Sequence, residues 1–244
     1  MSGPSYSALV AVVRGEGEAL IAASKLGLDE KVPSCGDWTV HDLCLHVGAV
    51  YAHVARIVDE RLVASPGARR DAPDCVEPVA WVGERLDHLV QSLSDCAPDT
   101  PMWNWSLLPQ DASFWARRMA HESAVHRFDA QRAHGVAQPV EDEVARDGLD
   151  ELVDVVLPRV IERDEPVITP ATYLFATTDE DEPWRLQVDD DGIYRLETLK
   201  NPDVTVRGTA SALLLAAYSR VGWASLDVTG DTALLDAWST AFRF

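Results

Sequence analysis

A glutamate and a histidine four residues apart carry the clearest chemical signal in the chain. Glu122 and His126 lie in a run, 114–129, whose pattern predicts a helix that ends at His134-Gly135. Residues four apart project from one face of a helix, one turn from each other. A carboxylate and an imidazole placed in this way can bind one divalent metal ion. The third ligand must come from elsewhere, and His46, at the centre of a predicted helix over 39–61, is the best candidate.

Two ligands on one helix and one on a neighbour predict an open metal site inside a helical bundle. Such a site keeps a coordination position for water, a thiol or a substrate oxygen. The order H-E-x-x-x-H excludes the H-E-x-x-H motif of zinc proteases, because the spacing is one residue too long. His121 lies about 100° around the helix from Glu122, so we expect it to point away from the metal. The alternative is that the Glu122 and His126 pair belongs to a solvated helix face.

Two charged residues on the same helix could support these ligands. Asp129 follows His126 by three residues, so it could accept a hydrogen bond from the imidazole N–H, and a surface salt bridge is the alternative. Arg118 precedes Glu122 by one turn. It could steady the Glu122 carboxylate or bind a carboxylate of the substrate.

For other polar residues near the predicted ligands, the sequence indicates a role in the metal site less strongly. His53 is two helical turns beyond His46, so it could line the mouth of the site, whereas His41 faces elsewhere and is expected at the surface. Cys35 precedes the same helix and is expected to pack as a small apolar side chain. We assign no nucleophilic cysteine.

The elements around these residues form two groups. Helical periodicity over 5–27, 39–61, from Asp74 and Pro78 to the residues before Pro98, and over 114–134 predicts four helices of some 20 residues. Thr39 and Asp42 have the spacing of a capping box at the start of the second helix. Four such helices with short connections predict a four-helix bundle.

In the second half of the chain, apolar and polar residues mainly alternate, as in strands, instead of recurring at helical spacing. Residues 140–163 predict one more helix, with a kink at Pro158. Strands are predicted over 171–178, 184–188, 192–196, 203–207 and 226–230, and helices over 211–220 and 231–240. The chain therefore reads as α+β with two domains, a bundle over 1–140 and a small α+β domain over 141–244, with a short sheet and flanking helices.

Composition limits the class of protein. The formal net charge of −19 and the pI near 4.6 argue against binding to nucleic acid or to an anionic membrane surface. No apolar run reaches the length of about 20 residues that a membrane helix needs. The start of the chain lacks the pattern of a signal peptide. The cysteines, Cys35, Cys44, Cys75 and Cys96, show no C-x-x-C spacing, so we expect free thiols in a cytoplasmic protein.

Three motifs together resemble one known family. They are Pro33-Ser34-Cys35 with Trp38-Thr39-Val40-x-x-Leu43-x-x-His46; Phe114-Trp115 through His121-Glu122-x-x-x-His126-Arg127-x-Asp129; and Asp203-Val204-Thr205-Val206-Arg207-Gly208 with Leu213-Leu214-Leu215-x-x-x-x-Arg220 and Asp227-Val228-Thr229-Gly230-Asp231. In this order they look like the mycothiol-dependent maleylpyruvate isomerase family, over nearly the whole chain. The resemblance implies a DinB-like four-helix domain that binds zinc, or another divalent metal, through His46, Glu122 and His126.

The resemblance also implies a chemistry. Relatives use mycothiol, a small thiol, as cofactor or co-substrate, so the protein needs no catalytic cysteine of its own. In the isomerase, the thiolate adds to a conjugated double bond, the carbon–carbon bond rotates, and the thiol leaves. Other relatives transfer the thiol to an electrophile. The expected partners are therefore this thiol and a small unsaturated or electrophilic acid such as maleylpyruvate.

One arginine of the second domain belongs to this expectation. Arg220 matches a family position that faces an anionic group, although Ser219 stands where the family pattern has glycine. We expect Arg220 to orient the thiol or the substrate in a cleft between the domains. The alternative is that it caps its own helix, where a cation interacts favourably with the helix dipole.

Two other classes of function stay open at this point. One is a metal-dependent hydrolase or lyase that uses no thiol. The other is a non-enzymatic protein that binds a small molecule.

Overall fold

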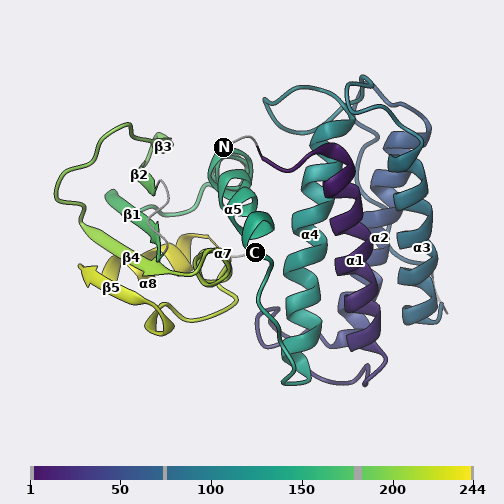
Figure 1. Cartoon of the computed structure of the whole chain (residues 1–244), viewed down its shortest axis with the longest axis horizontal. Coiled ribbons are helices and arrows are strands. Elements are labelled where there is room, and N and C mark those ends of the chain that lie inside the picture. Colours follow the sequence, from purple (N-terminus) through teal and green to yellow (C-terminus); the bar gives the residue numbers. More distant parts are fainter. Residues whose placement is uncertain (1–2, 74–75, 179–182, 243–244) are drawn as a thin grey trace. The chain divides into compact units, whose positions relative to one another are not determined.

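The computed structural model describes residues 3–73, 76–178 and 183–242, and within these ranges the N-terminal part contains four α-helices. They are α1 (Tyr6–Ser24), α2 (Val40–Asp59), α3 (Pro78–Ser94) and α4 (Ala112–Ala133). α1 packs on α4 and α3, and α2 packs on α3 and α4 (Figure 1). The predicted four-helix bundle is confirmed.

Local side chains set the ends of the two helices that matter for the site. The Thr39 hydroxyl accepts from the backbone N–H of Asp42, whose carboxylate accepts from the Thr39 N–H, so the predicted capping box starts α2. Asp111 caps α4 by accepting from the N–H of Ser113. At the other end of α4, Gly135 has φ +70°, a left-handed conformation that stops a helix and that glycine adopts without strain.

The start of α3 differs from the expectation in one detail. Glu77 is the residue that caps α3, through the backbone N–H groups of Val79 and Ala80, and Pro78 occupies the first turn. Asp74, which we expected to precede this helix, and Cys75 lie outside the described residues.

A glycine brings α2 close to α3 near the middle of the bundle. A Cβ atom added to Gly48 would lie 2.3 Å from Nε1 of Trp81, far inside van der Waals contact. Only glycine therefore lets the Trp81 ring lie across α2 at this point. Gly48 is two residues after His46, so this close approach fixes the segment of α2 that presents the histidine.

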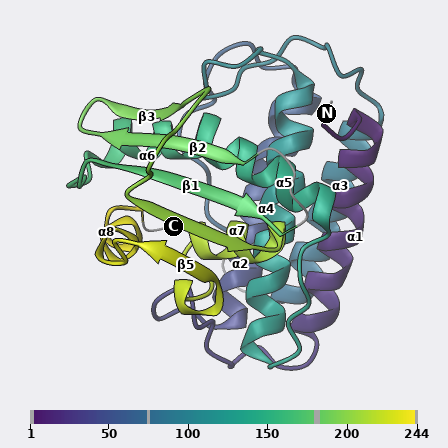
Figure 2. The same cartoon turned by 60° about the vertical axis from the view of Figure 1, so that its left-hand side comes forward.

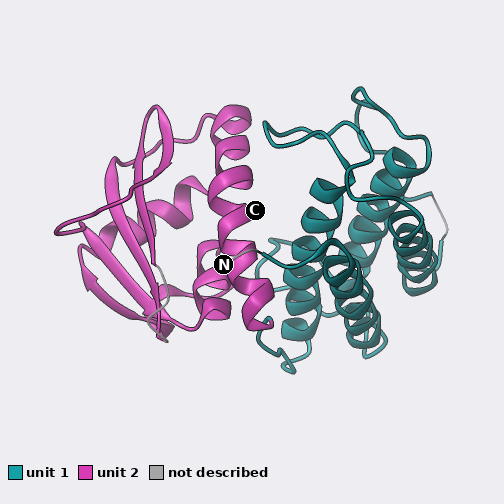
Figure 3. Ribbon diagram, turned by 45° about the horizontal axis from the view of Figure 1, so that its top comes forward, with its two compact units in different colours: residues 1–140 teal, residues 141–244 magenta. Residues whose placement is uncertain are grey.

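The chain divides into two compact units, Met1–Val140 and Glu141–Phe244 (Figure 3). The second unit opens with α5 (Asp142–Glu151), a π-helical turn η1 (Leu152–Val156) and α6 (Leu157–Asp164). The single kinked helix that we expected over 140–163 is therefore two α-helices with a π-helical turn between them. The π turn lies directly before Pro158, whose nitrogen has no hydrogen to donate to the carbonyl four residues back.

A five-stranded mixed sheet forms the centre of the second unit, within the residues described there (Figure 2). Its strands are β1 (Ala171–Thr177), β2 (Trp184–Asp189), β3 (Gly192–Arg195), β4 (Val204–Gly208) and β5 (Asp227–Gly230). The order is β3-β2-β1-β4-β5, and β1 and β4 are parallel whereas the other pairs are antiparallel.

Two helices and an aromatic cluster complete the second unit. They are α7 (Ala210–Ala217) and α8 (Ala233–Ala241), with a short 3₁₀ turn, η2 (Trp223–Ser225), between them. The rings of Tyr173, Phe175 and Trp238 pack edge to face in its core. α7 ends earlier than predicted because Ser219 adopts φ +59°. The α+β prediction is confirmed, and no helix among the described residues is long and apolar enough to cross a membrane.

Candidate metal centre

The three predicted ligands converge inside the first unit. His46 comes from α2, and Glu122 and His126 come from α4. One ligand atom of each lies within 4.8 Å of the others. Oε1 of Glu122 is 3.6 Å from Nε2 of His46 and 3.3 Å from Nε2 of His126. These three side chains form a candidate metal-binding triad, and their role as ligands stays a prediction.

Glu122 is held as a carboxylate. Its second oxygen accepts a hydrogen bond of 2.8 Å from Arg118, one helical turn earlier. Burial raises the pKa of Glu122, but hydrogen bonds from His126 and His46 and the charge of Arg118 outweigh burial and hold that pKa well below its usual range. Arg118 therefore contacts Glu122, the first of the two roles that we considered for it.

Asp129 orients His126. Its Oδ2 lies 3.0 Å from Nδ1 of His126, and the aspartate is fully buried, which excludes a surface salt bridge. A proton on Nδ1 that points at Asp129 leaves Nε2 free to bind a metal, the arrangement common among metal-binding histidines. Burial lowers the pKa of His126, but Asp129 and Glu122 outweigh it and raise that pKa to about 9.

A loop before α2 supports Asp129 from the other side. The Ser34 hydroxyl donates to Oδ1 of Asp129 at 2.6 Å, and Sγ of Cys35 lies 3.7 Å from Oδ2. Cys35 is half-buried, and its thiol faces this carboxylate, so packing as an apolar side chain does not describe it fully. Local sequence patterns did not predict the Ser34 contact, because 95 residues separate the two partners.

His46 has different neighbours. Its ring packs 4.8 Å from that of Trp38, and its Nδ1 lies 3.3 Å from Nη2 of Arg69. Burial lowers the pKa of His46, and this effect outweighs the hydrogen bond with Glu122. Arg69 lies in the loop between α2 and α3, and no sequence motif pointed to it.

The other histidines of α2 and α4 lie outside the triad. His53 is half-buried, and its pKa is lowered by burial and then by the charges of Arg69 and Arg56. His41 is exposed beside Asp42, as expected. His121 is buried elsewhere on α4 and does not belong to the cluster of ligand atoms.

Arg220 is buried in the second unit. Its Nη1 donates to the carbonyl oxygen of Tyr218 at 3.0 Å, and Tyr218 is the residue at the C-terminal end of α7. The helix-capping contact that we considered as the alternative is therefore present. A role of Arg220 in binding an anion stays a prediction.

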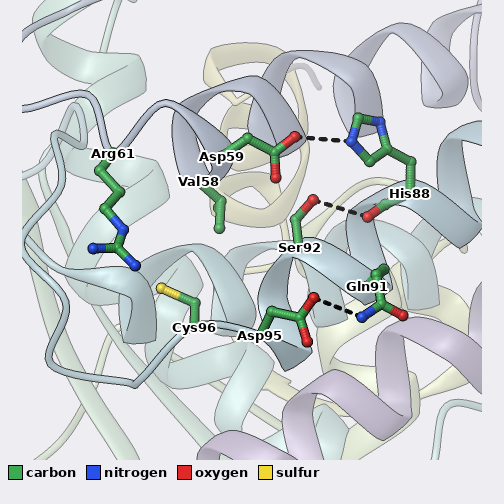
Figure 4. Close-up of a pocket in the computed structure, with 8 residues that line it drawn as sticks. All are labelled: Val58, Asp59, Arg61, His88, Gln91, Ser92, Asp95 and Cys96. Carbon is green, nitrogen blue, oxygen red and sulfur yellow. Dashed lines mark hydrogen bonds and ion pairs between the residues drawn. The ribbon is translucent and has the colours of Figure 1, made fainter.

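A separate cavity of about 290 Å³ lies at another part of the bundle. It is lined by Val58, Asp59, Arg61, His88, Gln91, Ser92, Asp95 and Cys96 (Figure 4). His88 pairs with Asp59 at 2.8 Å, and Gln91 donates to Asp95 at 2.6 Å, so both carboxylates already have partners. None of the triad residues lines this cavity.

The donor set of the triad suits a divalent ion. Two imidazoles and one carboxylate are the ligands of open zinc sites, in which a fourth position stays available. The ionised Glu122 and the proton on Nδ1 of His126 match this requirement, and a metal would take the place of the second ring proton of His126, on Nε2. The arrangement could therefore hold zinc and expose one side of it to a small molecule.

Comparisons with known proteins give one consistent result. Residues 10–131 match the mycothiol maleylpyruvate isomerase N-terminal domain, and residues 143–237 match the C-terminal domain of the same family. Two crystal structures of the mycothiol-dependent maleylpyruvate isomerase, one of them a histidine-to-alanine mutant, share the fold with a TM-score of 0.67. Their identities are 13% and, for the mutant, 11%, over 95% of this chain and 98% of theirs. A search of curated proteins finds no match.

The two domain matches lie in the same order as the two compact units and together cover most of the chain. From these matches, and from the triad on α2 and α4 that the first unit assembles, it follows that the chain belongs to the mycothiol maleylpyruvate isomerase family.

Proposed function

We propose that this protein is a metal-dependent enzyme that uses a low-molecular-weight thiol, mycothiol, as cofactor or co-substrate. Its substrate is a small unsaturated or electrophilic acid, which it isomerises, as in the case of maleylpyruvate, or to which it transfers the thiol. The observation that carries the proposal is the convergence of His46, Glu122 and His126 in a chain of this family.

A divalent ion bound by the triad would supply positive charge that favours the thiolate over the thiol at neutral pH. The side chains of the protein do the rest. Arg118 keeps Glu122 ionised and in place, and Asp129 fixes the tautomer of His126. No cysteine thiol lies in the cluster of ligand atoms among the described residues, in keeping with a thiol that arrives with the cofactor.

The test is an activity screen on the full-length protein. The purified chain is incubated with zinc, mycothiol and a panel of maleylpyruvate, other unsaturated acids and simple electrophiles, and the products are read by mass spectrometry. We expect turnover of at least one acid that requires both zinc and the thiol. Isomerised acid without a mass change identifies an isomerase, and a thiol adduct identifies a transferase.

Two controls separate this proposal from its competitors. Turnover that is equally fast without thiol would identify a metal-dependent hydrolase or lyase and would refute the role of mycothiol. His126→Ala should lower the zinc content measured by atomic absorption, whereas His41→Ala, on the exposed face of α2, should not. Equal zinc content in both variants would contradict the assigned ligands.

A further inference from the structure

The cavity drawn in Figure 4 lies where two helices of the bundle end side by side. Gly48 of α2 lies against Trp81 of α3, and Asp59, at the end of α2, pairs with His88 further along α3. The two helices therefore run in the same direction. Both present their last carbonyl groups and the negative end of the helix dipole near the cavity. This end of the bundle favours a positively charged group.

Two carboxylates that line the cavity each keep one oxygen without a protein partner. Oδ2 of Asp59 lies 2.8 Å from Nε2 of His88, and Oδ2 of Asp95 accepts from the side-chain amide of Gln91 at 2.6 Å. Oδ1 of each aspartate has no hydrogen-bond partner among the residues that the structure describes. An ammonium group has three N–H donors and no acceptor, so it suits these two oxygens.

Arg61 lines the same cavity with the opposite charge. Its side chain points toward Cys96, and the carboxylates of Asp59 and Asp95 lie on the other side of the space (Figure 4). Within the described part of the chain, the Arg61 guanidinium has no ion pair or hydrogen bond with either aspartate. The opposite charges are therefore kept apart, and a molecule that carries both charges can pair with each of them.

The backbone of Arg61 is strained in a way that glycine would relieve. Arg61 has φ +47°, a left-handed conformation that glycine adopts without strain. Its N–H donates to the Val58 carbonyl at 3.2 Å, and the next N–H, of Leu62, donates to the Ile57 carbonyl at 3.1 Å. Glycine is the usual residue at this position of such a helix end. The arginine that stands here instead places a guanidinium at the cavity.

The size of the cavity restricts the ligand to a small molecule. Its volume of about 290 Å³ corresponds to about ten water molecules at about 30 Å³ each. Val58 and Ser92, which are both buried, complete the lining. An α-amino acid matches this space, because it is small and carries an ammonium group and a carboxylate on one carbon atom.

We infer that this cavity is a binding site for a free α-amino acid. Asp59 and Asp95 bind its ammonium group, and Arg61 binds its carboxylate. A guanidinium suits that task because its planar fork donates two parallel hydrogen bonds to one carboxylate. The inference does not rest on the metal-dependent function proposed above, because none of the triad residues lines the cavity.

The first test is calorimetric titration of the full-length protein with each of the standard L-amino acids. We expect at least one of them to bind, and its N-acetyl derivative and its C-terminal amide to bind about tenfold more weakly. The N-acetyl derivative lacks the ammonium group, and the amide lacks the carboxylate. The inference is overturned if no amino acid binds at about 10 mM, or if either derivative binds as tightly as its parent.

Arg61→Gly separates ligand binding from folding. Glycine relieves the left-handed backbone, so we expect an unchanged or higher melting temperature. The amino acid should bind about tenfold more weakly, whereas its amide, which has no carboxylate for Arg61, should bind as it does to the wild type. Arg56→Gln is the control, because it removes a positive charge from α2 outside the cavity, and it should leave binding unchanged. Equal binding in the two variants would refute the role of Arg61.

The thiol of Cys96 gives a second readout in the wild type. Cys96 lines the cavity and is half-buried, whereas Cys35, also half-buried, lies beside Asp129. We expect a saturating amino acid to slow the alkylation of Cys96 by iodoacetamide and to leave that of Cys35 unchanged, as measured by mass spectrometry of the peptides. Protection of both thiols, or of neither, would place the bound amino acid elsewhere and overturn the inference.

Discussion

At the residue scale, two contacts hold the predicted ligands of the candidate site, one made by an aspartate and one by an arginine. Asp129 sets the orientation of His126, and Arg118 holds Glu122. Both supports come from α4 itself, at helical spacings of three and four residues, so sequence periodicity could suggest them. Ser34 and Arg69 come from loops, where no periodicity fixes the direction of a side chain, and they could not be predicted in this way.

Asp129→Asn tests the first of these supports. An asparagine keeps the shape of the side chain but can turn a donor toward Nδ1 of His126, which favours the tautomer that cannot bind a metal through Nε2. We expect zinc affinity to fall by about 10- to 100-fold. The measurement is a competition titration with a chromophoric chelator. Asp87→Asn, at an exposed ion pair with Arg14 on the same unit, should show wild-type affinity.

The pKa of His126 predicts how the stability of the metal-free protein depends on pH. In the folded chain this pKa is raised to about 9, above the value of about 6.5 expected after unfolding. The protonated imidazole therefore contributes stability that is fully present below about pH 6.5 and is lost as the pH rises through about 9. Urea unfolding at several pH values, with a chelator present, measures this loss.

His126→Gln provides the comparison, because glutamine keeps polar contacts but does not titrate. We expect the wild type to lose more stability than this variant between pH 6.5 and 9. Equal slopes in the two proteins would show that Asp129 and Glu122 do not hold a proton on His126.

At the scale of the elements, sequence patterns were most informative where the determinants are local. The capping box of Thr39 and Asp42 and the stop at Gly135 involve neighbours in the chain, so the bounds of α2 and α4 followed within a few residues. The π turn before Pro158 was predicted only as a kink. The sequence shows that the nitrogen of Pro158 cannot donate a hydrogen bond, but packing decides which other hydrogen bonds form in its place. The early end of α7 depends on the left-handed conformation of Ser219, a residue that carries no sequence signal for it.

Gly48→Ala tests the close approach of α2 and α3. The added methyl group would lie 2.3 Å from Nε1 of Trp81 and must displace that ring, at a cost of about 1–3 kcal/mol. Alanine recovers about 1 kcal/mol through its higher helix propensity. We expect net destabilisation in a thermal melt, and weaker zinc binding because the segment that carries His46 shifts.

Gly15→Ala is the control for helix propensity. Gly15 is exposed on α1, and nothing lies within 4 Å of an added Cβ atom. This substitution should stabilise the protein by about 0.5–1 kcal/mol. A stabilised Gly48→Ala variant would contradict the packing that we describe.

At the scale of the whole molecule, the two units have different contents. Met1–Val140 contains every residue of the candidate triad and its supporting contacts, whereas Glu141–Phe244 contains the sheet and Arg220. The sequence indicated this difference through the change from helical to alternating patterns near residue 140. It could not indicate what Arg220 contacts, because the hydrogen bond to the Tyr218 carbonyl depends on how the chain turns after α7.

Arg220→Lys tests whether the second unit contributes to turnover. Lysine keeps the positive charge at the end of α7 but cannot grip a carboxylate with two parallel hydrogen bonds. If Arg220 orients an anionic group, kcat/KM for the acid identified in the activity screen should fall by about tenfold or more, with an unchanged melting temperature. Full activity in this variant would assign Arg220 to helix capping alone.

The placement of all three candidate ligands between residues 46 and 126 bears on how such a protein can diverge. Substitutions in the second unit leave the three candidate ligands untouched, so selection can alter Glu141–Phe244 without changing them. The loop that carries Arg69 offers a second route, because an exposed loop tolerates insertions that a packed helix does not. Proteins that diverge in this way would keep the candidate metal site and change the molecules that they bind. Relatives with little sequence identity could then share a single architecture.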